Sequence, residues 1–446
     1  MPQTTKSSST RAFSQSVIAK LLVVGVNAAT GIVSARALQP SGRGEMAAMI
    51  LWYVFLAGAF TFGIPSALTY QLRKNPDRRA ELLGSAVLLA LLSSALAICV
   101  GLLGMSFWLA KYDPRIIFFA KLFLLNTPVA ALFLVGRAAL ESDDDFTASN
   151  LSLIGPPAVT LLLLGIMWLT HGLDPVAAAW CYVPAGLPSF YLMVRQLHRS
   201  FKIRFRNFLE NARLLMSYGI RSYGIDLCGT MALYVDQALV VRILRPEMMG
   251  TYVVALSLSR MLNAFHTSVV MVLFPKAVSA KPDEVLAMTG KAARLSTLLT
   301  AAAGLVVIAT GPLLLRVLYG KEYLSAGSIL RILVAEVILS GTTLVLSQAF
   351  MALSRPGVVT TLHVIGLALT VPLMLILVPR WGTEGAAVSL LLSTLVRFIA
   401  VMLCFPIVLK TAPPNILVGK ADLQMIYETL LGRTRRMRQQ TVESIT

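Results

Sequence analysis

Long apolar stretches, each of about 20 residues or more, follow one another from Val17 to Leu409, and short polar segments separate them. A helix of this length spans the hydrocarbon core of a bilayer, and it is longer than a strand of an outer-membrane barrel. The pattern therefore predicts an all-α polytopic membrane protein with about twelve transmembrane helices. The predicted spans are 12–36, 46–71, 82–109, 116–140, 149–170, 175–195, 212–241, 247–275, 290–318, 326–353, 357–379 and 385–409.

Short motifs at the ends of the apolar stretches are repeated in the second half of the chain. A motif at the end of the first predicted span recurs at an offset of 206 residues, and a second motif recurs at an offset of 210. The chain thus resembles one structural unit used twice. The matching pairs are Arg36-x-Leu38-x-Pro40-x-x-x-Gly44 with Arg242-x-Leu244-x-Pro246-x-x-x-Gly250, and Gly172-x-Asp174-x-x-Ala177 with Gly382-x-Glu384-x-x-Ala387.

The repeat predicts two pseudo-symmetric six-helix lobes that face each other across a central cleft. Because each half holds an even number of spans, both halves enter from the same side, and the axis that relates them should follow the membrane normal. The expected divisions are an N-terminal lobe (1–195), a basic cytoplasmic connector (196–212), a C-terminal lobe (213–410) and a cytoplasmic tail with an amphipathic basic helix (411–446). Arg36 and Arg242 fall at the periplasmic ends of their spans, where they are expected to act as hinge or anchor residues.

Charge sets the orientation of the predicted bundle. Only 13% of the residues are charged, yet the formal net charge is +18. Loops that are rich in Lys and Arg stay in the cytoplasm, and most such residues lie on the side of the two termini, so both termini are predicted to be cytoplasmic. The positive charge is then a topology signal, and no nucleic-acid partner is expected.

The connector and the tail both suit a membrane surface. The connector is rich in Arg, Lys and Phe, and we expect Phe201, Phe205 and Phe208 to face lipid. In the tail, apolar residues at helical spacing over 421–438 run into a cluster of arginines. This pattern fits either an interfacial helix on anionic lipid or a docking site for a cytoplasmic partner.

Apart from the charged residues assigned to the loops and span ends, eight acidic or basic residues fall inside the predicted spans. Each costs about 2.5–3.5 kcal/mol in hydrocarbon, so each is expected to face a cavity or a partner. They are Lys20, Arg221, Asp226, Asp236, Arg260, Arg331, Glu336 and Arg397.

Basic residues within the spans point to an anionic ligand. Arg260 and Arg397 lie near the middle of spans 8 and 12, with no acid within a turn on the same helix. The planar guanidinium group binds phosphate with two hydrogen bonds, so these two, with Lys20 and Arg221, are the candidate contacts to a phosphate or pyrophosphate group. Hydrogen bonding to neighbouring backbone carbonyls is the alternative.

The acidic members suggest ion coupling or charge pairing. Asp226, Asp236 and Glu336 are candidates for carrying a proton or Na⁺, and Arg331 could pair with Glu336. Lys20 maps onto Asp226 at the repeat offset of 206, so these two are predicted to face each other across the cleft. The alternative is that each finds a partner within its own half.

Other polar groups give weaker signals. His266 and His363 within the spans could titrate or be satisfied core residues. The acidic segment 141–145 could bind a cation or form a solvated turn before the next helix. The four cysteines are scattered singly, without the spacing of metal ligands. No phosphate-binding loop, His-Glu-x-x-His or Gly-x-Ser-x-Gly motif is present, so no cofactor, metal or catalytic residue is expected, and the chain is predicted not to be an enzyme.

A series of motifs in a fixed order resembles a known family. They are 35–45 (Ala-Arg-Ala-Leu-Gln-Pro-Ser-Gly-Arg-Gly-Glu), Asp236 followed by Gly250-x-Tyr252-x-x-Ala255, Leu318-Tyr319-Gly320-x-x-Tyr323-x-x-Ala326, Gln348 through Ser354-Arg355-Pro356, and Leu377-Val378-Pro379-x-x-Gly382-x-x-Gly385-Ala386-Ala387. Together they resemble the polysaccharide-biosynthesis branch of the multidrug/oligosaccharidyl-lipid/polysaccharide (MOP) exporter superfamily, the Wzx-type flippases. Ser354-Arg355-Pro356 stands where that family usually has Gly-x-Pro.

The resemblance implies twelve to fourteen helices in two lobes around a central cavity. It implies that the protein moves an undecaprenyl-pyrophosphate-linked oligosaccharide, such as a repeat unit of O-antigen, capsule or exopolysaccharide, across the bacterial inner membrane by alternating access. A cation-coupled multidrug exporter of the same fold is one alternative, and a membrane-bound polymerase or ligase is another. The expected partners are the lipid-linked substrate and membrane lipids, with other polysaccharide-assembly proteins left open.

Overall fold

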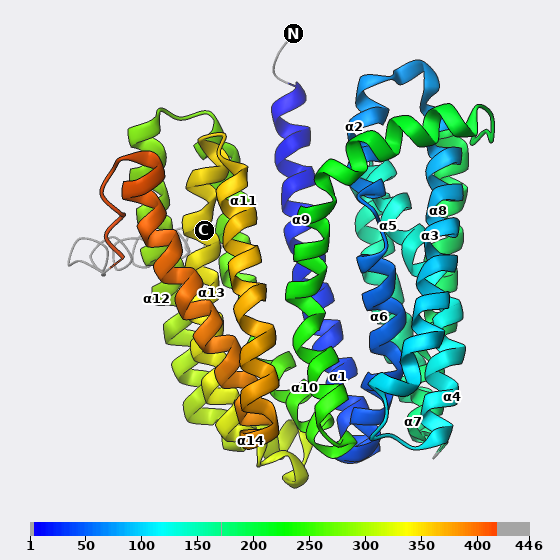
Figure 1. Ribbon diagram of the computed structural model, residues 1–446, viewed down its shortest axis with the longest axis vertical. Coiled ribbons are helices and arrows are strands. Elements are labelled where there is room, and N and C mark those ends of the chain that lie inside the picture. Colours follow the sequence, from blue (N-terminus) through cyan, green and yellow to red (C-terminus); the bar gives the residue numbers. More distant parts are fainter. Residues whose placement is uncertain (1–3, 171, 417–446) are drawn as a thin grey trace, which may run out of the picture.

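The protein is a bundle of long helices in the computed structural model (Figure 1). The structure describes the backbone of residues 4–170 and 172–416. Side chains are described for residues 21–170 and 172–416. No strand occurs in the described residues. The α-helices are α1 (Thr4–Ala59), α2 (Ile64–Lys74), α3 (Arg79–Trp108), α4 (Pro114–Phe123), α5 (Thr127–Ser142), α6 (Phe146–Leu169), α7 (Pro175–Trp180), α8 (Tyr182–Phe201), α9 (Phe208–Ile243), α10 (Pro246–Arg260), α11 (Asn263–Val278), α12 (Pro282–Leu314), α13 (Ala326–Ala352) and α14 (Pro356–Cys404). Short helical turns are η1 (Pro76–Arg78), η2 (Leu124–Asn126), η3 (Leu315–Tyr319), η4 (Lys321–Tyr323) and η5 (Phe405–Leu409).

The helices confirm the all-α membrane class. In the described part of the chain, ten helical segments are long and apolar enough to cross a membrane. Two of them contain a break, because Gln39 within α1 has φ 57° and ψ 178°, and Gly382 within α14 has φ 59° and ψ −135°. When these two are each divided at the break, the ten segments become twelve, which is compatible with the twelve predicted spans. Both breaks fall in the duplicated motifs.

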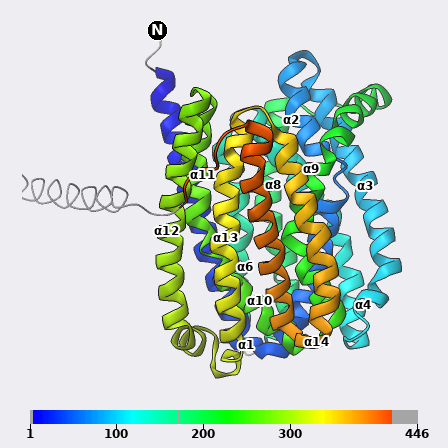
Figure 2. The same cartoon turned by 60° about the vertical axis from the view of Figure 1, so that its left-hand side comes forward.

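Two groups of helices stand apart in Figure 1. Helices α2 to α8 form one bundle, and α11 to α14 form the other. In Figure 2 the four helices α11 to α14 stand side by side along the long axis of the molecule. Helices α1, α9 and α10 run between the two bundles, and α9 packs on both α3 and α14. Each bundle therefore comes mostly from one half of the chain.

The duplicated glycines meet each other at one end of the bundle. A Cβ added to Gly44 would lie 1.8 Å from the carbonyl oxygen of Pro246, and one added to Gly250 would lie 1.9 Å from that of Pro40. Only glycine allows the two backbones to approach this closely. The contact is reciprocal, as expected when two copies of one motif face each other about a pseudo-two-fold axis.

The duplicated arginines lie at the same end. Arg36 donates hydrogen bonds to the carbonyls of Val317 and Leu318 in η3, at the end of α12. The guanidinium of Arg242 lies 4.2 Å from the ring centroid of Phe107 in α3. Each arginine therefore ties a central helix to a bundle, which gives physical support to the anchor hypothesis.

The connector lies against the bundle of α2 to α8. The backbone N–H of Arg204 donates to the carbonyl of Ala80 at 3.1 Å. Arg78 donates to Glu210 at 2.7 Å and to Asn211 at 2.8 Å. The expectation that Phe201 faces lipid is wrong, because its ring is buried beneath the guanidinium of Arg79, whereas Phe205 is exposed.

Candidate functional site

A membrane-embedded cavity of about 200 Å³ brings together Arg260 and Arg397. It lies among α9, α10, α11, α13 and α14, and Glu336 also lines it. The walls otherwise combine apolar residues with amide, imidazole and hydroxyl groups. The polar wall residues are Arg260, Asn263, Glu336, Ser340, His363, Thr370, Ser393, Thr394 and Arg397.

Arg260 is held in place by a buried carboxylate. It is the last residue of α10, at an interruption before α11 begins at Asn263. Its guanidinium lies 3.3 Å from Asp236 Oδ2, and it also donates to the carbonyl of Leu233 at 3.3 Å. The hydroxyl of Tyr252 donates to the same carboxylate oxygen at 2.8 Å, and Asp236 is only 1% exposed. The ion pair fixes the direction in which Arg260 points while leaving its side chain 31% exposed.

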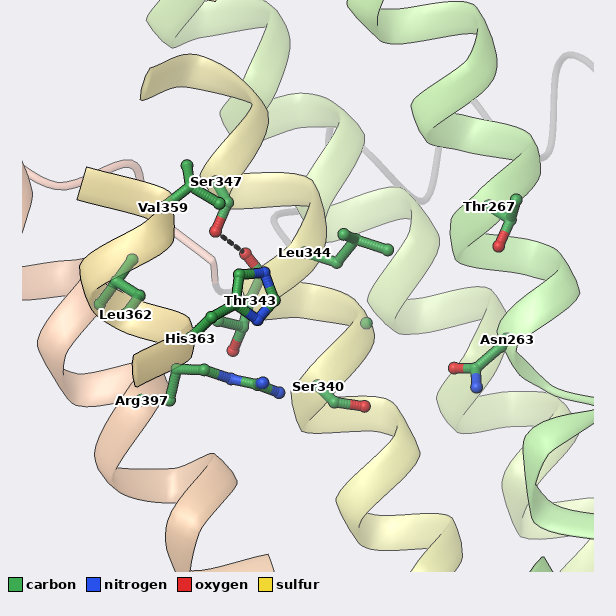
Figure 3. A pocket seen from close by; sticks show the side chains of 11 residues that line it. Asn263, Thr267, Ser340, Thr343, Leu344, Ser347, Val359, Leu362, His363 and Arg397 are labelled. Atoms are coloured by element: carbon green, nitrogen blue, oxygen red, sulfur yellow. Dashed lines mark hydrogen bonds between the residues drawn. The ribbon is translucent and has the colours of Figure 1, made fainter. Parts of the chain in front are cut away.

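Arg397, unlike Arg260, forms no ion pair in the described part of the chain. It projects from α14, and its buried Nε has no hydrogen-bond partner in the described structure. Figure 3 shows its side chain extended toward α13, beneath the ring of His363. A buried polar group without a partner is costly, so this nitrogen is available to an acceptor that enters the cavity.

A second cavity of about 290 Å³ adjoins the first. Asn263, Ser340, His363 and Arg397 line both cavities. The second one adds hydroxyl groups, among them Thr267, Thr343 and Ser347 (Figure 3). Neutral donors and acceptors of this kind suit the hydroxyl groups of a sugar.

A third cavity of about 250 Å³ is apolar. Leu21, Val23 and Val24 of α1 line it together with Leu153 of α6 and residues of α11. Arg260 and Asn263 belong to its wall as well as to that of the first cavity. The arginine therefore stands where a polar space and an apolar space meet.

The acidic candidates have defined partners. Glu336 accepts a hydrogen bond from Thr394 at 2.9 Å inside the first cavity. Within the described residues it forms no ion pair with Arg331, which is exposed. Asp226 accepts from Ser66 of α2 at 3.0 and 3.1 Å.

Of the other two predicted phosphate contacts, Arg221 does not belong to this group. Arg221 is exposed on α9 and does not line the cavity that holds Arg260 and Arg397. The side chain of Lys20 lies outside the described residues, so its pairing with Asp226 stays a prediction. The predicted helix in the tail also lies outside them.

Sequence reasoning missed the neutral wall of the site. Asn263 and the hydroxyl residues of α13 were not predicted as site residues, because serine and threonine in a helix usually bond to their own backbone. A signal was present in their spacing. Ser340, Thr343 and Ser347 recur at intervals of three and four, which places them on one helical face. His363 lines the site, whereas His266 is fully buried, and neither of its ring nitrogens is hydrogen-bonded in the described structure.

Arginines from neighbouring helices pair with the acidic segment 141–145. Asp143 pairs with Arg79 at 2.7 Å, and Asp144 pairs with Arg73 at 3.3 Å. Asp145 caps α6 by accepting from the backbone of Ala148. Among the described residues, no cluster of His, Cys, Asp and Glu could hold a metal ion.

Comparison with known families agrees with this architecture. Residues 33–328 match the model of the polysaccharide biosynthesis protein family. The chain belongs to this family. A curated relative from Haloferax volcanii, described as a probable low-salt glycan biosynthesis flippase (Agl15), is 24% identical over 233 residues. That alignment covers 51% of this chain and 49% of the relative, so it spans about half of each protein.

Solved structures with the same fold are transporters. A lipid II flippase, MurJ, in an inward closed conformation matches this family member with a TM-score of 0.76 and 14% identity, over 90% of this chain and 88% of that one. A MATE-family multidrug transporter of the MOP superfamily, in an inward-facing conformation, matches with a TM-score of 0.68 and 14% identity, over 86% and 95% of the two chains. At these identities the likeness establishes the fold, which is the predicted MOP fold.

Proposed function

We propose that the protein is a flippase that moves an undecaprenyl-pyrophosphate-linked oligosaccharide across the membrane by alternating access, and that it is not an enzyme. The observation that carries this proposal is the convergence of Arg260 and Arg397, from separate helices, on one intramembrane cavity. A polar head group cannot cross hydrocarbon unaided, and a hydrated cavity lined by arginines lowers that barrier. The relation to a polysaccharide biosynthesis family supports the same class of substrate.

The neighbouring cavities suit the other parts of such a substrate. The hydroxyl-lined cavity adjoins Arg397 and offers neutral hydrogen-bonding groups to sugars. The pyrophosphate would lie between the two arginines. Movement of one lobe against the other would then transfer the head group. Lobes at 1–195 and 213–410 are the proposed moving units, with the connector and tail outside them.

The acids provide a route for energy coupling. Asp236 and Glu336 both lie close to the proposed anion site, so an incoming pyrophosphate would compete with them for the arginines. Binding of a proton or Na⁺ to Glu336 would relieve this competition. Asp226, hydrogen-bonded to Ser66, is a second candidate for such a role, and Lys20, Arg221 and Arg331 remain proposed charged contacts.

The location follows from the charge pattern and the substrate. We place the protein in the bacterial inner membrane with both termini in the cytoplasm. Its substrate would be a repeat unit of O-antigen, capsule or exopolysaccharide. Membrane lipids and other polysaccharide-assembly proteins are the further proposed partners.

Replacement of both arginines tests the proposal. The Arg260→Ala/Arg397→Ala variant should lower the flipping of a lipid-linked oligosaccharide in proteoliposomes at least about 100-fold, since each charge-assisted hydrogen bond contributes about 1.5–3 kcal/mol. Arg355→Ala, at an exposed loop position, is the matched control and should retain activity.

A conservative variant distinguishes a loss of transport from a loss of folding. Loss of Arg260 leaves Asp236 buried without its cation, which by itself destabilises a protein. Arg260→Lys keeps the charge and should insert normally while transport falls. Normal flipping by the double alanine variant would refute the arginine site, and export of cationic drugs in place of glycolipid would favour the multidrug alternative.

A further inference from the structure

A separate cavity of about 170 Å³ lies between α6 and α8, in the bundle of α2 to α8. Its wall has two chemically different parts. Arg195, Gln196 and Arg199 supply polar groups near the end of α8, whereas Leu151, Leu192 and Met193 supply an apolar surface. None of these residues belongs to the proposed transport site.

The two arginines of this cavity have no counter-charge among the described residues. They are exposed, they lie four residues apart on one helical face, and like charges at this spacing repel each other. Within the described part of the chain neither one forms an ion pair, whereas five other arginines of the same bundle do. Those pairs are Arg73–Asp144 (3.3 Å), Arg78–Glu210 (2.7 Å), Arg79–Asp143 (2.7 Å), Arg115–Asp174 (3.1 Å) and Arg137–Glu141 (3.1 Å).

The carboxylate that is hydrogen-bonded to this cavity, Asp145, already has two partners within the protein. Asp145 accepts from the backbone N–H of Ala148 at 3.0 Å with one oxygen, and from Gln196 Nε2 at 2.8 Å with the other. Its carboxylate therefore caps α6 and orients Gln196. The positive charges of Arg195 and Arg199 remain for an anion from outside the protein.

The apolar part of the cavity faces the membrane. Leu151 is 52% exposed and Leu192 is 44% exposed, and both lie on segments that are long and apolar enough to span a bilayer. A ligand that fits must combine an anionic head with a hydrocarbon chain. Basic pockets between transmembrane helices near the cytoplasmic surface bind lipid head groups in this way.

We infer that this cavity is a binding site for an anionic phospholipid, with the phosphate between Arg195 and Arg199 and an acyl chain along Leu151 and Leu192. Arginine suits the phosphate because its donors form a planar fork. On the proposed orientation, this end of α8 meets the cytoplasmic leaflet. The bound lipid would fill the gap between α6 and α8.

Native mass spectrometry of the full-length protein tests this site, with phosphatidylglycerol and phosphatidylcholine as probes. The wild type should retain phosphatidylglycerol in preference to phosphatidylcholine. Arg195→Gln/Arg199→Gln should weaken phosphatidylglycerol binding about 30-fold, on the basis of about 1 kcal/mol for each basic residue. Arg195→Lys/Arg199→Lys keeps both charges and should retain most of the binding.

A charge-matched variant controls for the general surface potential. Arg204→Gln/Arg206→Gln removes two exposed charges from the connector without touching the cavity, and it should keep binding within about threefold of the wild type. Equal loss in both glutamine variants would overturn the site. Displacement of the lipid by millimolar inorganic phosphate would overturn the assignment to a lipid and identify a site for free phosphate.

Discussion

At the scale of single residues, the proposed transport site depends on how one arginine is held. Asp236 and Tyr252 lie 16 residues apart, yet their side chains meet, and the carboxylate then reaches Arg260. This chain of contacts places a cation at the edge of the cavity without filling it. The carboxylate thus positions Arg260, and the guanidinium keeps an exposed part that can meet the proposed substrate.

Removal of the tyrosine hydroxyl tests this positioning. Tyr252→Phe leaves Asp236 with one fewer hydrogen bond, which is worth about 1 kcal/mol. We expect the substrate concentration for half-maximal flipping to rise about fivefold, because Arg260 is held less firmly. Tyr191→Phe, on an exposed tyrosine, is the control. Identical titration curves for Tyr252→Phe and the wild type would show that the network does not position Arg260.

At the scale of elements, the two copies of the repeated motif pack tightly against each other at one end of the bundle, which we call the sealed end. The crossing of α1 and α10 relies on the contact of Gly44 with the Pro246 carbonyl and of Gly250 with the Pro40 carbonyl. Arg36 and Arg242 reinforce the same end by binding to opposite bundles. An alternating-access cycle must break these contacts when the end opens.

A methyl group at this crossing should favour the open end. Gly44→Ala places a Cβ against a backbone carbonyl, and such overpacking costs about 1–3 kcal/mol. The fully buried Ala35 lies nearby on α1, so Ala35→Cys reports on opening. In the Gly44→Ala background its thiol should react at least about tenfold faster with a maleimide.

The same helix provides the control for that experiment. A Cβ added to Gly31 of α1 meets no atom within 4 Å, so Gly31→Ala should leave the reaction rate of Ala35→Cys unchanged. If Gly44→Ala reacts no faster than Gly31→Ala, the crossing does not act as the seal.

At the scale of the whole molecule, the arrangement of charges predicts the orientation of the protein in the membrane and the direction of transport. The sealed end holds η3 and η4, and the opposite end holds the connector and its ion pair between Arg78 and Glu210. The positive-inside rule predicts that the sealed end faces the periplasm. The substrate would then enter from the cytoplasmic side.

Site-directed labelling checks this orientation. In a variant whose four native cysteines are replaced, Lys321→Cys lies at the sealed end and Arg355→Cys lies at the other. A membrane-impermeant thiol reagent added to whole cells should label Lys321→Cys only. Both sites are exposed, so lysed cells supply the control in which both react. The reverse pattern in whole cells would invert the proposed topology.

The sequence by itself determined the features that depend on local chemistry. Apolar length gave the membrane class, and the recurrence of Pro40 and Pro246 marked where helices turn, because proline and glycine limit a helix wherever they stand. It also singled out Arg260 and Arg397, since any charge within a span is unusual.

Only the tertiary structure decided which of these groups act together. It showed that Arg260 pairs with Asp236 and that Arg221 does not line the cavity. It also showed that the hydroxyl face of α13 lies beside Arg397. It further showed Arg195 and Arg199 beside an apolar groove, with no ion pair among the described residues. The physical reason is that side-chain partners on different helices depend on the rotation and depth of each helix, which packing sets and local sequence does not.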